Sequence, residues 1–203
     1  MSNEDVLNLR WWRPLLRCAF VFVVGALTLG FTPSSLRAEE AEQPLRAEEA
    51  EQPRYSGRFE LTDSGTAAAE RDRSVKEVAQ VFPAFFRKMA VGKMRKAANI
   101  VSFVEFSWGD ASVIIRSDES AGWKTGLDKK EEEFRAKDGK RFLLSRWMED
   151  GALHSKARGE TGTRSSIFRL IDGGDVLTVA TTIQINQAEK PIAYTARYKR
   201  AEP

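Results

Sequence analysis

The feature that most constrains this fold is an alternation of apolar and polar residues in the C-terminal half. Residues 177–185 and 192–198 place a mainly apolar side chain at every second position, the period of a strand with one buried face. From residue 100 onward, similar short segments are separated by turns such as Asp138-Gly139 and Asp150-Gly151. Many short strands joined by Gly- and Asp-containing turns are typical of antiparallel sandwiches and barrels.

One segment has a different period. A first predicted strand at 55–62 is followed by apolar residues at spacings of three and four, which predict an amphipathic helix: Val75, Val78, Phe82, Phe85, Phe86 and Met89. Ser74 and Glu77 fit a capping box that would begin this helix, and Pro83 predicts a kink or two consecutive helices.

The other face of this helix is basic, with Arg87, Lys88, Lys93, Arg95 and Lys96. We expect its apolar face on the sheet and its basic face in water; contact with a membrane is the alternative. We therefore predict a mainly β fold. It is an antiparallel up-and-down β-barrel of about 9–10 strands, closed so that no strand edge is exposed. A helical segment at 72–97, after the first strand, would cap one end.

Residues 1–35 are predicted to be a signal peptide or an N-terminal membrane anchor. Three arginines precede or border an uncharged run of 14 residues, Cys18 to Phe31. Such a run suits a signal peptide better than a membrane span, which needs about 20 residues. A clean Ala-x-Ala cleavage motif is missing, so an anchor stays open, as does a buried helix in the cytoplasm. We expect export: a periplasmic, secreted or membrane-anchored protein.

A tandem repeat of LRAEEAEQP fills residues 36–53 and has a net charge of −4. This composition predicts a disordered linker, because it has little apolar surface to bury. The remaining domain, 54–203, has no cysteine and a net charge of +6. Its length allows a sufficient core without disulfides. The modest positive charge favours solubility and anionic surfaces over nucleic acid, and we expect a monomer.

The order of one strand, a helical pair and an antiparallel meander over residues 55–200 resembles the calycins, and within them the fatty-acid-binding-protein arrangement. The segments 85–90 (FFRKMA) and 191–198 (PIAYTARY) also resemble exported bacterial lipocalin-like proteins. The resemblance implies a barrel that holds a small apolar ligand. The chain departs from the lipocalin Gly-x-Trp by having Phe59 at the Trp position. Arg197 and Tyr198 are adjacent where fatty-acid-binding proteins have Arg-x-Tyr, so they point to opposite faces and that carboxylate clamp is not carried over.

The sequence offers no catalytic or metal-binding constellation, and no cofactor is predicted. His154 is the only histidine, whereas structural zinc needs about four ligands. We find no Gly-x-Ser-x-Gly elbow and no phosphate-binding Gly-rich loop. The three carboxylates of 131–133 would point alternately to both faces of a strand, which indicates a solvated segment. A non-enzymatic protein is therefore expected.

A charged residue on the apolar face of a predicted strand is the remaining indication of a binding site. Arg146 shares its phase with Phe142, Leu144 and Met148. A buried charge is costly unless it is paired. An inward Arg146 would therefore need a carboxylate from Glu105 or from a ligand, which its planar fork suits. A bulge that turns Arg146 outward is the alternative.

The aromatic side chains Trp123, Tyr194 and Tyr198 are candidates for the wall of a pocket, or for a packed core without a ligand. With the four residues of the Arg146 phase they form the predicted ligand site. We predict extracytoplasmic, non-enzymatic binding of a small apolar or amphipathic, lipid-like ligand. The alternative is an envelope interaction or structural protein with a solid barrel core and a basic, membrane-facing helix.

Overall fold

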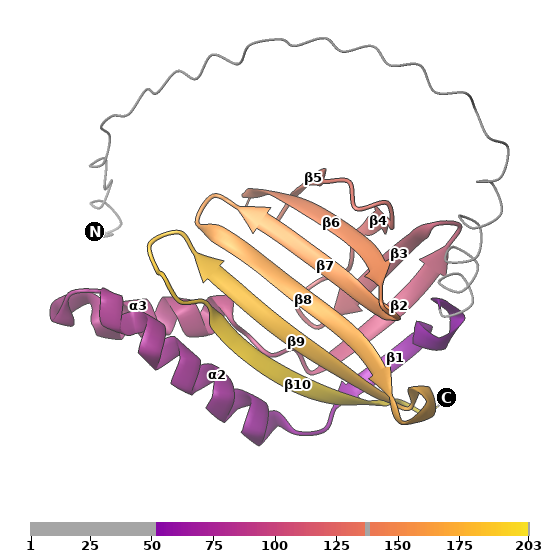
Figure 1. Ribbon diagram of the computed structural model, residues 1–203, viewed down its shortest axis with the longest axis horizontal. Coiled ribbons are helices and arrows are strands. Elements are labelled where there is room, and N and C mark those ends of the chain that lie inside the picture. Colours follow the sequence, from indigo (N-terminus) through magenta and orange to yellow (C-terminus); the bar gives the residue numbers. More distant parts are fainter. Residues whose placement is uncertain (1–51, 137–138, 203) are drawn as a thin grey trace, which may run out of the picture. The chain divides into compact units, whose positions relative to one another are not determined.

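The computed structural model describes residues 52–136 and 139–202 (Figure 1). The predicted leader, residues 1–35, lies outside the described residues. So does the predicted linker, except for its last two residues, which begin the short 3-10 helix Gln52–Tyr55. No helix of the described part is long and apolar enough to cross a bilayer.

Ten strands form one antiparallel sheet in the order β4-β3-β2-β1-β10-β9-β8-β7-β6-β5. Their bounds are β1 Gly57–Leu61, β2 Phe103–Gly109, β3 Ser112–Ser117, β4 Lys124–Gly126, β5 Glu132–Arg135, β6 Arg141–Glu149, β7 Ala152–Gly159, β8 Gly162–Ile171, β9 Val176–Ile185 and β10 Ile192–Arg200. The sheet curls into a nearly closed barrel, and Figure 1 shows its strands following one another around it. The predicted up-and-down barrel is confirmed.

The two ends of the sheet meet near β4 and β6. Asp128 and Trp147 form an isolated antiparallel bridge, and the backbone N–H of Lys129 donates to the carbonyl of Arg146 at 3.1 Å. Tight turns set the register of the long strands. Asp150 and Gly151 both have positive φ, 50° and 68°, the conformation of a two-residue type I′ hairpin. The predicted Asp-Gly turn thus joins β6 to β7.

Two α-helices separate β1 from β2: α2 (Ser64–Val78) and α3 (Ala84–Ala97). They are joined by the 3-10 turn η2 (Ala79–Val81), and the φ and ψ of Pro83 at the start of α3 are non-helical. The expected break at Pro83 is confirmed. The expected start at Ser74 is wrong: α2 begins ten residues earlier, because the Asp63 side chain accepts the Thr66 N–H at 3.0 Å and caps it.

The helix α2 lies beside the first half of β10 (Figure 1). β1 pairs with β10 only from Tyr198 to Arg200, so part of the β10 edge has no neighbouring strand. Side chains of α2 satisfy that edge instead. Ser74 Oγ accepts the N–H of Ala193, and a Glu70 carboxylate oxygen accepts the N–H of Thr195, both at 2.9 Å.

The apolar stripe predicted for the helical segment is only partly packed. Val75 and Val78 of α2 are buried against β9 and β10, and α3 adds Met94 to the same cluster. Phe85, Phe86 and Met89, however, are exposed. The expectation of one continuous packed face is wrong beyond Pro83, because the break there gives α3 a new direction.

A second and larger cluster fills one part of the barrel. It is centred on Tyr55, Phe59, Phe106 and Phe168, whose rings meet edge-on or tilted at 5.5–6.0 Å between centroids. The Tyr55 hydroxyl is within hydrogen-bonding distance of the carbonyls of Gly151 (2.8 Å) and Phe168 (3.1 Å). This solid part supports the remainder of the barrel, which is hollow.

Candidate functional site

The hollow part is a cavity of about 320 Å³. Its wall is formed by inward-facing residues of β2, β3 and β6–β10, by the segment 99–101 that follows α3, and by the β3–β4 loop. The apolar part of the wall comprises Ile100, Val101, Val104, Ile115, Trp123, Phe168, Val179 and Ala196. The polar part comprises Asn99, Ser117, Glu119, Ser120, Arg146, Ser155, Arg164, Ser166, Thr181, Tyr194 and Tyr198.

A chain of polar groups runs along one side of this wall. Arg164 Nη2 donates to the Tyr194 hydroxyl at 3.3 Å, and that hydroxyl donates to the Asn99 carbonyl at 3.3 Å. The Tyr198 hydroxyl donates to the Val101 carbonyl at 3.2 Å. Burial raises the pKa of Tyr198 well above its usual range, with a further contribution from Tyr194. The Tyr198 phenol is therefore neutral near pH 7 and can donate a hydrogen bond.

Arg146 points into the barrel and is 4% exposed. One terminal nitrogen, Nη1, donates to the carbonyls of Val113 (3.0 Å) and Trp123 (2.9 Å). Nε has no hydrogen-bond partner among the described residues. Desolvation lowers the pKa of Arg146 to about 10, although the charge of Glu132 opposes this. The guanidinium therefore stays charged near pH 7, buried and with an unused donor.

The orientation and the hydrogen-bond acceptors of Arg146 decide between the expected alternatives. It does not turn outward, and backbone carbonyls rather than Glu105 receive its hydrogen bonds. Glu105 instead lies 3.6 Å from Arg116 in a half-exposed ion pair. No protein carboxylate within the described ranges bonds to Arg146, so the second predicted partner, a ligand, remains.

Four of the seven predicted site residues line the cavity: Trp123, Arg146, Tyr194 and Tyr198. The other three do not. Phe142 packs its ring against Trp123 and Phe134, at 5.1 and 6.1 Å between centroids. Leu144 is buried outside the cavity wall, and Met148 belongs to the solid core cluster.

Arg164 and its neighbours on β8 were missed by the sequence reasoning. Arg164 and Ser166 share the inward phase of Phe168 and line the cavity, as does Thr181 opposite Ser166 on β9. The Ser166 and Thr181 hydroxyls lie 3.4 Å apart. The signal was available, because Arg164 stands in an inward phase with Phe168 just as Arg146 does with Leu144.

A second hollow of about 460 Å³ adjoins the cavity. It is lined by 119–123 and by Arg135 and Ala136, and it shares Glu119, Ser120 and Trp123 with the main cavity. The loop between them requires a glycine. Gly122 has φ +88°, and a Cβ there would lie 2.6 Å from Ile114 Cγ2. Trp123, which follows this glycine, lines both hollows and packs its ring against Phe134 and Phe142.

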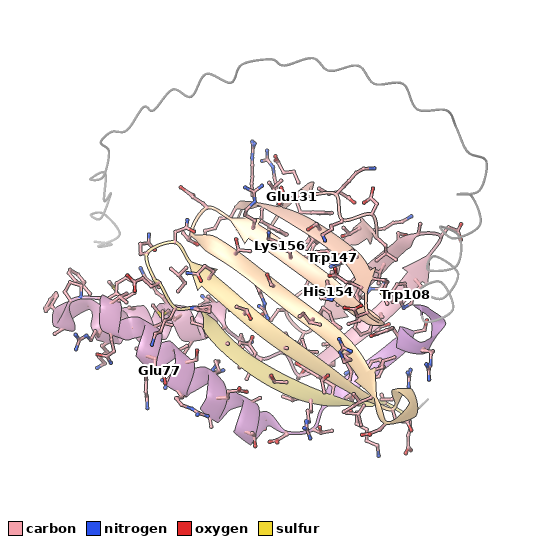
Figure 2. All side chains as sticks on the ribbon, in the orientation of Figure 1. Glu77, Trp108, Glu131, Trp147, His154 and Lys156 are labelled. Carbon is pink, nitrogen blue, oxygen red and sulfur yellow. The ribbon has the colours of Figure 1, made fainter. Side chains whose placement is uncertain are left out.

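His154 lies on the outer face of the barrel, where it stacks on Trp147 at 5.2 Å between centroids (Figure 2). Its Nε2 is 4.0 Å from a Glu149 carboxylate oxygen. The carboxylates of 131–133 are engaged locally: Glu131 pairs with Arg158, Glu133 pairs with Arg141, and Glu132 accepts the backbone N–H of Gly126 at 3.0 Å. In the described part of the chain no group of three His, Cys, Asp or Glu residues could hold a metal ion. The cavity thus presents binding groups and no nucleophile–base pair involving His154.

No known family and no curated protein matches this sequence. Solved structures do match. An abundant heat soluble protein (SAHS) of Ramazzottius varieornatus superposes with a TM-score of 0.51 and 10% identity, covering 73% of this chain and 96% of that one. Lipid binding protein 8 of Caenorhabditis elegans has a TM-score of 0.48 and 13% identity, covering 73% and 96%. Fatty-acid-binding protein 1 of Echinococcus granulosus has 0.46 and 12%, covering 74% and 99%. At 10% identity, the likeness to the Ramazzottius protein concerns the fold alone, a nearly closed antiparallel barrel with two helices after its first strand.

Proposed function

We propose that this protein binds, without covalent chemistry, a small lipid-like amphipathic molecule with an anionic head group. The observation that carries the proposal is Arg146. It is a buried cation on the wall of a cavity, and its Nε has no partner within the described residues. A buried charge that no carboxylate hydrogen-bonds is unfavourable, and a carboxylate is the group whose geometry matches a guanidinium best.

The cavity supports the same conclusion. Its volume of about 320 Å³ is at the lower end of ligand sites, which are mostly apolar with a few placed polar groups. Arg164 provides a second cation, whereas the one acidic residue of the wall, Glu119, is exposed. A head group would lie among Arg146, Arg164 and the tyrosines, and an alkyl or ring portion against Ile115, Val179 and Phe168. A barrel with a solid core, the alternative expectation, conflicts with this cavity.

A binding assay with matched lipids tests the proposal. A fluorescent fatty-acid analogue would be titrated into the protein and then displaced with a long-chain carboxylate, its methyl ester or its alcohol. We expect the carboxylate to displace the probe at least tenfold more effectively than the two neutral compounds. Equal displacement by all three would contradict an arginine-held head group, and failure to bind any of them would contradict the proposal as a whole.

Two variants locate the head group. Arg146→Met and Arg164→Met remove a cavity charge with little change in volume, and Arg169→Met removes an exposed charge from β8 as a control. Each cavity variant should lose the preference for carboxylate over ester, and the control should keep it. Native mass spectrometry of the protein from its own host would show any resident ligand as an adduct lost on denaturation. The same spectrum tests the expectation of a monomer.

We further propose that the protein acts outside the cytoplasm. The support is the leader pattern, three arginines with an uncharged 14-residue run, whose length suits an export signal. Cell fractionation and N-terminal sequencing of the mature protein test this. A cytoplasmic protein that still begins at Met1 would contradict it.

A further inference from the structure

An exposed apolar patch lies where α2 gives way to α3. Val81, Phe85, Phe86 and Met89 are 52%, 89%, 48% and 53% exposed. They are four of the five large hydrophobic side chains that are exposed among residues 52–136 and 139–202. The Phe85 and Phe86 rings meet edge-on at 5.2 Å. We call these four residues the corner patch. Grouped exposed apolar residues of this kind mark interaction surfaces, whereas single ones do not.

The surroundings of the corner patch are basic. Residues 79–99 contain five Lys or Arg and no Asp or Glu. Two of these cations are engaged inside the protein: Arg95 forms a two-pronged ion pair with Asp72 of α2 at 2.9 and 3.1 Å, and Arg87 donates to the Phe82 carbonyl at 3.0 Å. The other three, Lys88, Lys93 and Lys96, are exposed, and no ion pair involves them in the described part of the chain.

We propose that the corner patch and these three lysines form a docking surface for an anionic lipid bilayer. The surface combines exposed aromatic rings with unpaired positive charge on one helix, which is the combination that binds the interface of an anionic membrane. Figure 1 shows the corner between α2 and α3 at the far end of the helix pair from β1. Phe85 and Phe86 belong neither to the barrel core nor to the cluster of α2, α3, β9 and β10.

The occupant is identified by charge complementarity. A second copy of this helix would bring like charges together, which opposes association. An anionic bilayer offers hydrocarbon for Phe85 and Phe86 and negative head groups for the lysines, without a specific partner sequence. The proposal does not depend on a ligand in the barrel, because none of the corner patch residues lines the cavity.

Sedimentation with vesicles tests the proposal on the full chain. Vesicles of phosphatidylcholine alone would be compared with vesicles that also contain phosphatidylglycerol. We expect at least tenfold tighter binding to the anionic vesicles, and weaker binding as salt is raised toward about 0.15 M, where charges are screened beyond about 8 Å. Equal binding to both vesicles, or binding insensitive to salt, would overturn the proposal.

Matched variants separate this surface from the rest of the chain. The double variant Phe85→Ala/Phe86→Ala and the triple variant Lys88→Glu/Lys93→Glu/Lys96→Glu should each weaken binding to anionic vesicles at least tenfold. The apolar control is Ile167→Ala, at the fifth exposed hydrophobic. The charge control reverses exposed lysines of β7, β10 and the β9–β10 turn: Lys156, Lys190 and Lys199. Binding should be the same in the controls and the wild type.

Hydrogen exchange provides a local readout, in case the N-terminal segment also binds lipid. Backbone amides of residues 81–90 should exchange more slowly when anionic vesicles are present, and those of strands β7 and β8 should not change. No protection at 81–90 would overturn the proposal even if the chain sediments. Chemical cross-linking between copies through the corner patch, without vesicle binding, would assign the surface to a protein contact instead.

Discussion

Filling the cavity should separate ligand binding from stability, and Ala196→Leu is the substitution that does this best. Ala196 is buried on β10, between Tyr194 and Tyr198 on the inward face, and it lines the cavity. Leucine adds three carbons where the structure has empty space. Each buried CH₂ contributes about 0.8 kcal/mol, so the gross gain is about 2 kcal/mol.

Two terms reduce this gain. Ordering a leucine side chain costs about 0.5–1 kcal/mol of entropy. The cavity wall is also partly polar, so part of the added leucine surface contributes less free energy than burial against apolar groups would. We therefore expect the unliganded variant to be about 1 kcal/mol more stable than the wild type. For a domain of this size that corresponds to a rise of roughly 2–4 °C in Tm.

The same substitution should weaken binding of the fatty-acid probe at least tenfold, because the added carbons occupy the ligand's space. Urea denaturation and probe titration measure the two effects on the same protein. Ala180→Leu is the control, since Ala180 is exposed on the outward face of the neighbouring strand β9. It should change stability by no more than about 0.5 kcal/mol and leave binding intact.

Two results would refute this reasoning. Destabilisation of Ala196→Leu by more than about 1 kcal/mol would mean that the site is filled, since overpacking a dense core costs about 1–3 kcal/mol. Unchanged affinity in a stable variant would mean that the ligand binds elsewhere.

Three further predictions concern the residues that hold the fold together. Arg146→Met should change the free energy of unfolding by less than about 2 kcal/mol. Two charge-assisted hydrogen bonds are lost, but so is the cost of a buried guanidinium, which a pKa lowered from its ordinary value to about 10 places at about 3 kcal/mol. Thermal unfolding checks this. Tyr55→Phe should destabilise by about 1–2 kcal/mol in urea, because the one hydroxyl that donates to the carbonyl of Gly151 or of Phe168 is lost. The Thr66 backbone N–H lowers the pKa of Asp63 below its ordinary 3.8. The wild type should therefore lose stability as the pH falls from 3.8 through the lower folded pKa, and Asp63→Ala should lack this part of the loss when urea midpoints are compared above and below pH 3.8.

The strands were predictable because burial of one barrel face forces alternation in the sequence itself. The break between the helices was equally local, since Pro83 lacks the N–H that a continuous helix needs. The start of α2 could not be predicted from the sequence, because residues 64–73 contain little apolar periodicity and only Ala67 among them is buried. The spacing of Ser74 and Glu77 matches a capping box, yet the Ser74 hydroxyl accepts a hydrogen bond from the backbone N–H of Ala193 at the edge of β10. That partner lies 119 residues away, so no local pattern could indicate it.

The candidate site, like the fold, could be predicted from the sequence only in part. The inward phase of Arg146 was visible from its apolar neighbours, and Arg164 could have been found in the same way. The acceptors of Arg146 could not, because they are backbone carbonyls of Val113 and Trp123. A carbonyl carries no sequence signal, and these two come close only when the β4 end of the sheet approaches β6. Sequence reasoning therefore assigned the charge a carboxylate partner, whereas the fold partly satisfies it with backbone and leaves Nε open.

The prediction that the whole apolar stripe of the helical segment packs on the sheet was wrong for a different reason, and that reason has a consequence for function. Periodicity identifies which residues share a face, but it does not identify what that face contacts. Val75 and Val78 use the stripe to pack on β9 and β10, while α3 buries Met94 and leaves Phe85 outside. Because the exposed half of the stripe and the cavity share no residue, the two proposed activities can fail independently. Ala196→Leu should weaken probe binding at least tenfold in a chain that still binds vesicles, and Phe85→Ala/Phe86→Ala should weaken vesicle binding and leave probe binding intact. If either variant lost both activities, the separation of cavity and corner patch would be wrong.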